Sequence, residues 1–228
     1  MRSTHLKIKI CGITNLEDAL MACEAGADAL GFVFYEKSPR YIEFSVAKDI
    51  VKKLPPFVKI VGLFVNVNSE DVNEVCQYVK VDIAQIHFDA DDDFFESLEV
   101  PFLRVVRATC KEDIVKYSDN YCLVDAFVEN FGGEGKRVAL EWFDGIDCSR
   151  IILAGGLTSE NLHELKSYNF YGVDVSSGVE SPTAHPDQTT APPPLPPPHP
   201  LPPPHPPLTT PHPHLPPDHP RPPTPTPP

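Results

Sequence analysis

The chain has 228 residues and a formal net charge of −13, and 24 of its 28 prolines lie in residues 182–228. Residues 1–181 hold 18 of the 19 basic and 30 of the 32 acidic residues, so we expect one folded domain over 1–181 and a Pro/His-rich, low-complexity, disordered tail over 182–228. An acidic chain without a stripe of Lys and Arg is poorly suited to nucleic acid or an anionic membrane surface, which favours a small-molecule partner.

Short β-rich runs alternate with amphipathic segments along residues 1–181. In chain order, the expected strands are 7–10, 29–34, 58–65, 83–87, 103–106, 121–125, 151–154 and 171–175. The expected helices between them are 16–24, 45–54, 71–79, 92–98, 112–117, 140–146 and 160–166. Asn15, Ser69 and Ser159 are expected to cap three of these helices at their N-termini.

Strict alternation of strand and helix predicts a parallel sheet. The second run, ALGFVF at 29–34, is apolar on both faces, as expected for a buried parallel strand. Eight strands are the number that closes a (β/α)8 TIM barrel, which is therefore the expected α/β fold. An open doubly wound sheet is the structural alternative.

The sequence also bears on location. No apolar stretch approaches the roughly 18–20 residues that cross a membrane, and residues 6–10 alternate Leu or Ile with Lys instead of forming a secretory apolar region. The six cysteines are scattered without a C-x-x-C pair, which suits free thiols in a reducing compartment better than disulfides or a zinc site. We therefore expect a cytoplasmic chain without a metal site.

Polar or glycine-rich residues stand beyond several strand ends, where a barrel places its active site. They are Cys11 with Gly12, Gln85 with His87, Asp125, Gly155 with Gly156, and the run Ser176, Ser177 and Gly178. Loops after the seventh and eighth strands present backbone N–H groups that bind phosphate in many barrels. We therefore expect a phosphorylated small molecule as substrate.

Each of these candidates also has a structural interpretation. Paired glycines such as Gly155 and Gly156 often mark only a turn. A cysteine at the position of Cys11 is more often a small buried apolar residue than a reactive one, and His87 is of a type that is more often structural. Asp125 follows an apolar run, where a buried carboxylate is costly without a partner or a function, which favours a functional role.

A series of motifs points to one family. They are KICGIT at 9–14, GFVF at 31–34 with SPRY at 38–41, GLFVN at 62–66, QIH at 85–87, Asp125 ahead of GGEGK at 132–136, LAGGL at 153–157 and GVDVSSGVE at 172–180. Over about residues 7–181 the chain closely resembles the phosphoribosylanthranilate isomerases of tryptophan biosynthesis. It differs at Phe88, where that family usually has glycine.

The resemblance implies a cofactor-free Amadori rearrangement of N-(5-phosphoribosyl)anthranilate to 1-(2-carboxyphenylamino)-1-deoxyribulose 5-phosphate, an aldose–ketose isomerisation. By the same match, Asp125 would protonate the furanose ring oxygen and Cys11 would remove the C2 proton. This pair needs a carboxyl that holds its proton more tightly, and a thiol that ionises more easily, than the free side chains.

The resemblance also implies binding roles. Arg40 would bind the anthranilate carboxylate, for which a guanidinium is suited, and His87 and Asp174 would lie close to the substrate. The phosphate would be held by Gly155, Gly156, Ser176, Ser177 and Gly178.

After Glu180 the chain turns to proline repeats where the resembled family continues into its eighth helix. We therefore expect a barrel that lacks its own eighth helix, at a cost of several kcal/mol if apolar strand surface is uncovered at about 25 cal/mol per Å². The tail is interpreted as a frameshift product or, alternatively, as a polyproline II spacer or ligand.

Two alternatives to the isomerase activity are kept. One is another phosphate-binding barrel enzyme, such as indole-glycerol-phosphate synthase, which a lysine base would indicate, or a histidine-pathway sugar isomerase, which an aspartate in place of Cys11 would indicate. The other is a catalytically impaired barrel whose Pro-rich tail binds a partner. A monomer or a homodimer is expected in each case.

Overall fold

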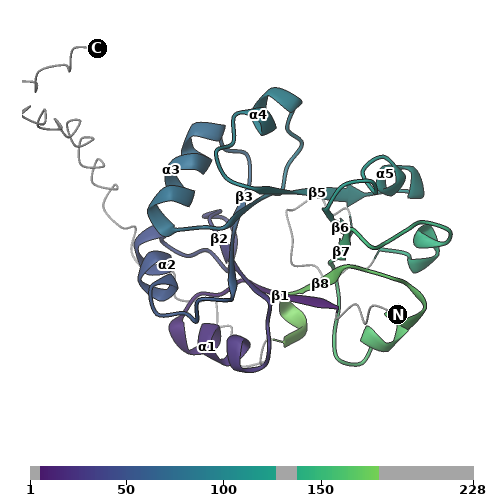
Figure 1. Ribbon diagram of the computed structural model, residues 1–228, viewed down its shortest axis with the longest axis horizontal. Helices are drawn as coiled ribbons and strands as arrows, with labels where there is room; N and C mark the ends of the chain where they lie inside the picture. The colour runs from purple at the N-terminus through teal and green to yellow at the C-terminus, as the bar shows by residue number, and fades with distance from the viewer. Residues whose placement is uncertain (1–5, 127–137, 180–228) are drawn as a thin grey trace, which may run out of the picture. The chain divides into compact units, whose positions relative to one another are not determined.

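In the computed structural model, which describes residues 6–126 and 138–179, eight parallel strands close into a barrel with helices on its outside (Figure 1). The strands follow one another around the ring in chain order, and β1 pairs with both β2 and β8. The predicted (β/α)8 TIM barrel is confirmed. The closed ring excludes the open doubly wound sheet.

All eight predicted strands are present, and no strand end differs from its predicted position by more than two residues. The strands are β1 (Lys7–Cys11), β2 (Ala29–Val33), β3 (Lys59–Phe64), β4 (Ile83–Ile86), β5 (Phe102–Ala108), β6 (Cys122–Ala126), β7 (Ile151–Leu153) and β8 (Gly172–Val175). The helices are α1 (Leu16–Glu24), α2 (Phe44–Val51), α3 (Ser69–Val79), α4 (Asp92–Glu96) and α5 (Lys111–Val115), and the 3-10 helices are η1 (Leu140–Phe143), η2 (Leu162–Ser167) and η3 (Ser177–Val179).

Asparagines cap the N-termini of two of the α-helices. Asn15 caps α1 as predicted, because its side-chain oxygen accepts a hydrogen bond of 2.9 Å from the backbone N–H of Asp18. The predicted cap at Ser69 is wrong. The oxygen of Asn68 accepts from the N–H of Asp71 at 2.8 Å, so α3 begins at Ser69 itself. Asn and Ser are both good caps, and the chain here uses the first of two adjacent ones.

The connections before β7 and β8 are 3-10 helices where α-helices over 140–146 and 160–166 were expected. In η1 the backbone leaves the helical region at Asp144, and Gly145 follows with φ +78°, so the helix ends after four residues. The predicted cap at Ser159 is also wrong. Asn161 precedes η2, and its side chain binds the loop after β7 instead of the helix end.

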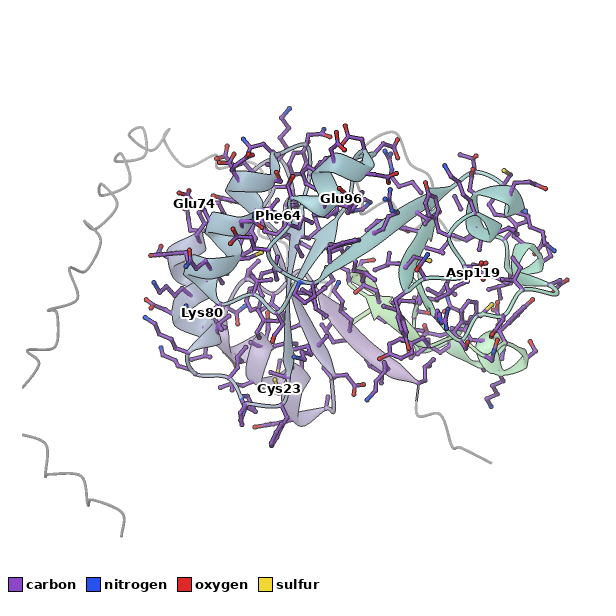
Figure 2. All side chains as sticks on the ribbon, turned by 45° about the horizontal axis from the view of Figure 1, so that its top comes forward. Cys23, Phe64, Glu74, Lys80, Glu96 and Asp119 are labelled. Carbon is purple, nitrogen blue, oxygen red and sulfur yellow. The ribbon has the colours of Figure 1, made fainter. Side chains whose placement is uncertain are left out.

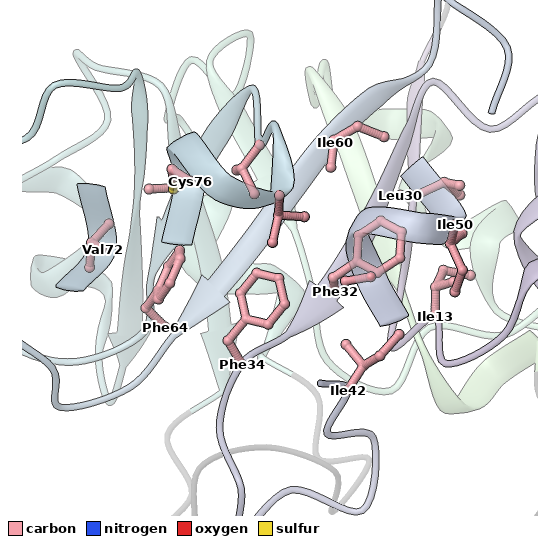
Figure 3. Close-up of a cluster of buried hydrophobic side chains, with 14 of the residues drawn as sticks. Ile13, Leu30, Phe32, Phe34, Ile42, Ile50, Ile60, Phe64, Val72 and Cys76 are labelled. Carbon is pink, nitrogen blue, oxygen red and sulfur yellow. The ribbon is translucent and has the colours of Figure 1, made fainter. Parts of the chain in front are cut away.

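The main core lies between the outer faces of β2 and β3 and the helices that cover them (Figure 3). Leu30, Phe32 and Phe34 alternate along β2 and its end with residues that face the barrel interior. Phe32 is fully buried, and the rings of Phe34 and Phe64 lie 5.5 Å apart between their centroids. This packing fixes β2 and β3 against α2 and α3.

Charged side chains cover the outer surface. Glu74 on α3 and Glu96 on α4 lie on the outside, whereas Phe64 is buried beneath α3 (Figure 2). Phe88, where the resembled family usually has glycine, packs edge-to-face on Phe94 with 5.3 Å between ring centroids. Among the helices that the structure describes, none is both long and apolar enough to cross a membrane.

Three expectations lie outside the described residues. They concern the tail over 182–228, the absence of an eighth helix after Glu180, and the GGEGK motif at 132–136. The cysteines are all free, as expected.

Replacing Phe32 with alanine tests the core on the outer face of β2. We expect Phe32→Ala to lower the free energy of unfolding by about 3–5 kcal/mol, because a fully buried ring leaves a cavity. Phe57→Ala is the matched control, since Phe57 is 96% exposed, and should change it by less than about 0.5 kcal/mol. Urea unfolding monitored by circular dichroism measures both, and equal losses would contradict this packing.

Candidate active site

The first strand brings two polar side chains into the barrel. Ile8 and Ile10 of β1 pack outward into the core, and because side chains alternate along a strand, Lys9 and Cys11 face the interior. Lys9 is only 5% exposed, which is rare for lysine and requires a partner. Lys9 was not among the predicted site residues.

The partner of Lys9 comes from the last strand. Lys9 and Asp174 are paired in the register of β1 and β8, and Lys9 Nζ donates to Asp174 Oδ1 at 2.7 Å. The two side chains are 6% and 9% exposed. Burial lowers the pKa of Lys9, but Asp174 and Cys11 outweigh this effect, so that its pKa is raised. Burial raises the pKa of Asp174, and the ammonium limits that rise. The short contact thus pairs the two groups inside the barrel.

Gly31 provides the space for this group. It lies opposite Cys11 in the register of β1 and β2. A Cβ atom at position 31 would stand 2.8 Å from Cys11 Sγ and 3.0 Å from Lys9 Nζ, closer than side chains normally approach. The absent side chain therefore lets the thiol and the ammonium occupy the same region of the interior.

The thiol of Cys11 does not ionise easily in this arrangement. Burial raises its pKa, Asp174 adds to the rise, and Lys9 and Arg40 oppose it without cancelling it. The expectation of a thiol that ionises more easily than free cysteine is thus wrong for the chain without substrate. The physical reason is that desolvation of the thiolate outweighs the nearby positive charges.

Asp125 enters the interior from β6. Its neighbours on that strand, Cys122 and Val124, are buried in the outer core, and Leu123 packs inside the barrel. Asp125 therefore points inward above Leu123. The register of β5 and β6 sets Arg107 beside it, so a guanidinium and a carboxyl stand on neighbouring strands at the mouth. Arg107 was not predicted as a site residue.

Gln85 and His87 enter from β4 and its end, where the N–H of His87 donates to the carbonyl of Phe64 at 3.0 Å. The two side chains are 2% and 7% exposed. Burial, with Arg107 and Lys9 nearby, lowers the pKa of His87 to about 4, so the ring is neutral at pH 7. Gln85 Oε1 is buried without a hydrogen-bond partner among the described residues, which leaves an acceptor available inside the barrel.

The side chain of Arg40, from the segment after β2, lies against the loop that follows β1. Its backbone N–H donates to Ser38 Oγ at 3.1 Å, which shapes the turn after β2. Its side chain lies against Gly12, where a Cβ atom would overlap Arg40 Cδ. Gly12 also has φ +93°, a conformation that glycine adopts without strain. Gly12 thus brings the guanidinium stem next to the end of β1.

The two predicted phosphate loops touch each other. Gly155 and Gly156 follow β7 with φ +87° and +60°, and Asn161 holds this loop by donating to the carbonyl of Gly156 at 2.8 Å. A Cβ atom at Gly178 would overlap the carbonyl oxygen of Leu157, so the loop after β8 packs directly on the loop after β7. Ser177 begins η3, whose first N–H groups lack partners within the helix.

The structure gathers the predicted residues at one end of the barrel. They stand on or just after the carboxyl ends of β1, β2, β4, β6, β7 and β8. Lys9 and Arg107 are added to them by the strand registers. Within the described residues, no group of three His, Cys, Asp or Glu side chains is placed to hold a metal ion.

Comparisons with known proteins identify similar chains. The model of the family described as N-(5'phosphoribosyl)anthranilate (PRA) isomerase matches residues 8–189. The N-(5'-phosphoribosyl)anthranilate isomerase of a Nitratiruptor species is 64% identical over 176 residues, which are 77% of this chain and 90% of that protein.

Solved structures agree with the sequence comparison. The crystal structure of phosphoribosyl anthranilate isomerase from Thermus thermophilus is similar with a TM-score of 0.69 and 33% identity, over 77% of this chain and 89% of that one. A phosphoribosyl anthranilate isomerase in complex with reduced 1-(o-carboxyphenylamino)-1-deoxyribulose 5-phosphate gives a TM-score of 0.66 and 36% identity, over 78% and 90% of the two chains.

The low pKa of His87 predicts a loss of stability in acid. Its pKa is about 4 in the folded chain and 6.5 when unperturbed, so the unfolded chain takes up the proton first as the pH falls. The contribution of the neutral His87 ring to the free energy of unfolding is present above pH 6.5 and is lost as the pH falls from 6.5 to 4. Between pH 7 and pH 5 this loss amounts to about 2 kcal/mol.

The free energy of unfolding should fall between pH 7 and pH 5 in the wild type, and in His87→Gln this fall should be smaller by about 2 kcal/mol. Urea titrations at both pH values measure it. His163→Gln, at an exposed histidine, is the matched control and should keep the wild-type decline. A decline in His87→Gln as steep as that of the wild type would show that the ring is not buried in its neutral form.

Proposed function

The chain belongs to the N-(5'-phosphoribosyl)anthranilate isomerase family, and we propose that Cys11 and Asp125 carry the proton transfers of its reaction. The enzyme catalyses the Amadori rearrangement of N-(5-phosphoribosyl)anthranilate to 1-(2-carboxyphenylamino)-1-deoxyribulose 5-phosphate in tryptophan biosynthesis. The observation that supports the site is that β1 and β6 carry these residues at the same end of one closed barrel.

The reaction needs one acid and one base. The carboxyl of Asp125 donates a proton to the furanose ring oxygen, the bond from C1 to that oxygen breaks, and the substrate nitrogen forms a Schiff base with C1. Cys11 as thiolate then takes the proton from C2, and the resulting enol tautomerises to the aminoketose as C1 gains a proton. Oxidation at C2 and reduction at C1 balance within the substrate, so the proposed steps use no external oxidant or cofactor.

The substrate carries an anion at each end, and the proposed binding residues match both. Arg40 binds the anthranilate carboxylate with its guanidinium, next to Cys11. The phosphate is bound at the paired loops by Gly155, Gly156, Ser176, Ser177 and Gly178. His87 and Asp174 are the further residues proposed to bind the substrate.

We propose a monomer or a homodimer, and the proposed residues all come from this one chain. The net charge of −13 supports a small phosphorylated substrate over nucleic acid or an anionic membrane as partner. The free cysteines support a cytoplasmic location.

Replacing the acid and the base tests their roles. Cys11→Ser and Asp125→Asn should each lower kcat at least a hundredfold, because each removes one proton transfer. The assay follows the loss of fluorescence of freshly generated phosphoribosylanthranilate by the purified chain. A variant that keeps a near wild-type kcat would remove that residue from the mechanism.

Cys23→Ser, near the end of α1, and Asp119→Asn, in the connection before β6, are the matched controls and should keep wild-type kcat, because both residues lie towards the amino-terminal ends of the strands, opposite the mouth. A folded wild-type chain without turnover would instead support the impaired barrel with a partner-binding tail.

Binding of the carboxylate is tested at Arg40. We expect Arg40→Gln to raise KM at least tenfold with a smaller effect on kcat, because the lost contact is present in both the ground state and the transition state. Gly12→Ala should have a similar effect on KM, since the new methyl group overlaps the side chain of Arg40. An unchanged KM in Arg40→Gln would place the carboxylate elsewhere.

A further inference from the structure

Lys9 has no role in the steps described above, although its charge is buried beside the proposed base. Its ammonium forms the 2.7 Å ion pair with Asp174. It also lies in the same small region as the thiol of Cys11, because one Cβ atom at Gly31 would stand 3.0 Å from Lys9 Nζ and 2.8 Å from Cys11 Sγ. Burying an ammonium is costly, and evenly packed apolar side chains would fill the same space without that cost. The burial of the Lys9 ammonium beside Cys11 therefore favours a functional role for this residue.

The charges inside this part of the barrel do not balance once Cys11 ionises. One ammonium, that of Lys9, faces two groups that can be anions, the carboxylate of Asp174 and the thiolate of Cys11. Asp174 already holds Lys9 through a hydrogen bond from Nζ. A thiolate at Cys11 would therefore compete with Asp174 for the ammonium of Lys9. How strongly Lys9 stabilises the thiolate depends on the charge of Asp174.

The other titratable groups at the mouth of the barrel come from other elements than β1 and β8. Arg40, from the loop after β2, adds a smaller attraction to the thiolate than Lys9 does. His87 at the end of β4 is neutral at pH 7, and Arg107 on β5 stands beside Asp125 on β6. Lys9 is thus the cation with the strongest effect on the thiol.

We propose that Lys9 is a positioning residue for the isomerisation, because its ammonium is shared between Asp174 and Cys11 and sets how readily the thiol loses its proton. Whatever draws the charge of Asp174 away from Lys9, such as hydrogen bonds from substrate hydroxyls, leaves more of the ammonium to the thiolate. The catalytic part of this inference rests on the proposed role of Cys11 as the base.

The test measures the rate at which iodoacetamide alkylates Cys11 between pH 6 and pH 11, by mass spectrometry of the Cys11 peptide. Lys9→Met should slow alkylation at pH 8 at least tenfold, by moving the midpoint up by one unit or more. Asp174→Asn should move the midpoint in the opposite direction and accelerate alkylation several-fold. Cys23 in the same samples is the internal control and should not respond.

Lys9→Met leaves Asp174 buried without its cation, which lowers the stability of the fold. The double variant Lys9→Met/Asp174→Asn removes both charges, and it should alkylate more slowly than Asp174→Asn alone because only the ammonium differs between them. Circular dichroism checks that each variant is folded. Shifts of the same sign in both single variants, or no difference between the double variant and Asp174→Asn, would overturn the proposal.

Turnover supplies a second readout. In Lys9→Met the optimum of kcat should move to higher pH and KM should stay within about threefold of the wild type, which loss of packing alone would not produce. If Cys11→Ser remains active, the proposed base is wrong while the alkylation result still stands. If Cys11→Ser is inactive and Lys9→Met leaves the pH midpoint of Cys11 alkylation unchanged, only the role of Lys9 is overturned.

Discussion

Closure of the barrel through β1 and β8 is the constraint on which the rest of the structure depends. Only when these strands pair do Lys9 and Asp174 meet and neutralise each other inside the protein. Removing one partner of such a buried pair typically costs about 3–5 kcal/mol, because the other charge is left without compensation. Strand β1 also carries Cys11. The charges of Lys9 and Asp174 therefore affect both the stability of the closed ring and the chemistry at its mouth.

The fold was predictable because buried parallel strands are apolar on both faces and therefore stand out from the segments between them. Its details were less so. Asn68 and Ser69 are adjacent capping residues, and nothing local decides which one starts the helix. Over 140–146 the pattern fits a helix of any length, and the chain leaves the helical conformation after Phe143, whose ring is packed against Phe170. Such choices depend on contacts distant in sequence.

The site was predictable to the extent that parallel strands all end on the same side of a barrel. Lys9 was missed for a physical reason. Lys7 and Lys9 stand on the same face of β1, and in sequence both look like solvent-exposed charges. Lys7 is exposed and pairs with Asp28 at the edge of the barrel, whereas Lys9 lies one step deeper and is buried. Depth along a strand follows from the register with β8, which only the structure provides.

The pairing of Lys9 with Asp174 also has a consequence for synthesis of the chain, since 165 residues separate the two partners. While the first strands emerge, the ammonium of Lys9 has no carboxylate to meet and stays hydrated. Strands β1 to β3 with α2 and α3 can pack their outer core early, because those contacts are local. Lys9 and Asp174 can pair only after β8 has been synthesised, so the two buried charges of the active site meet later than the local contacts of the first three strands can form.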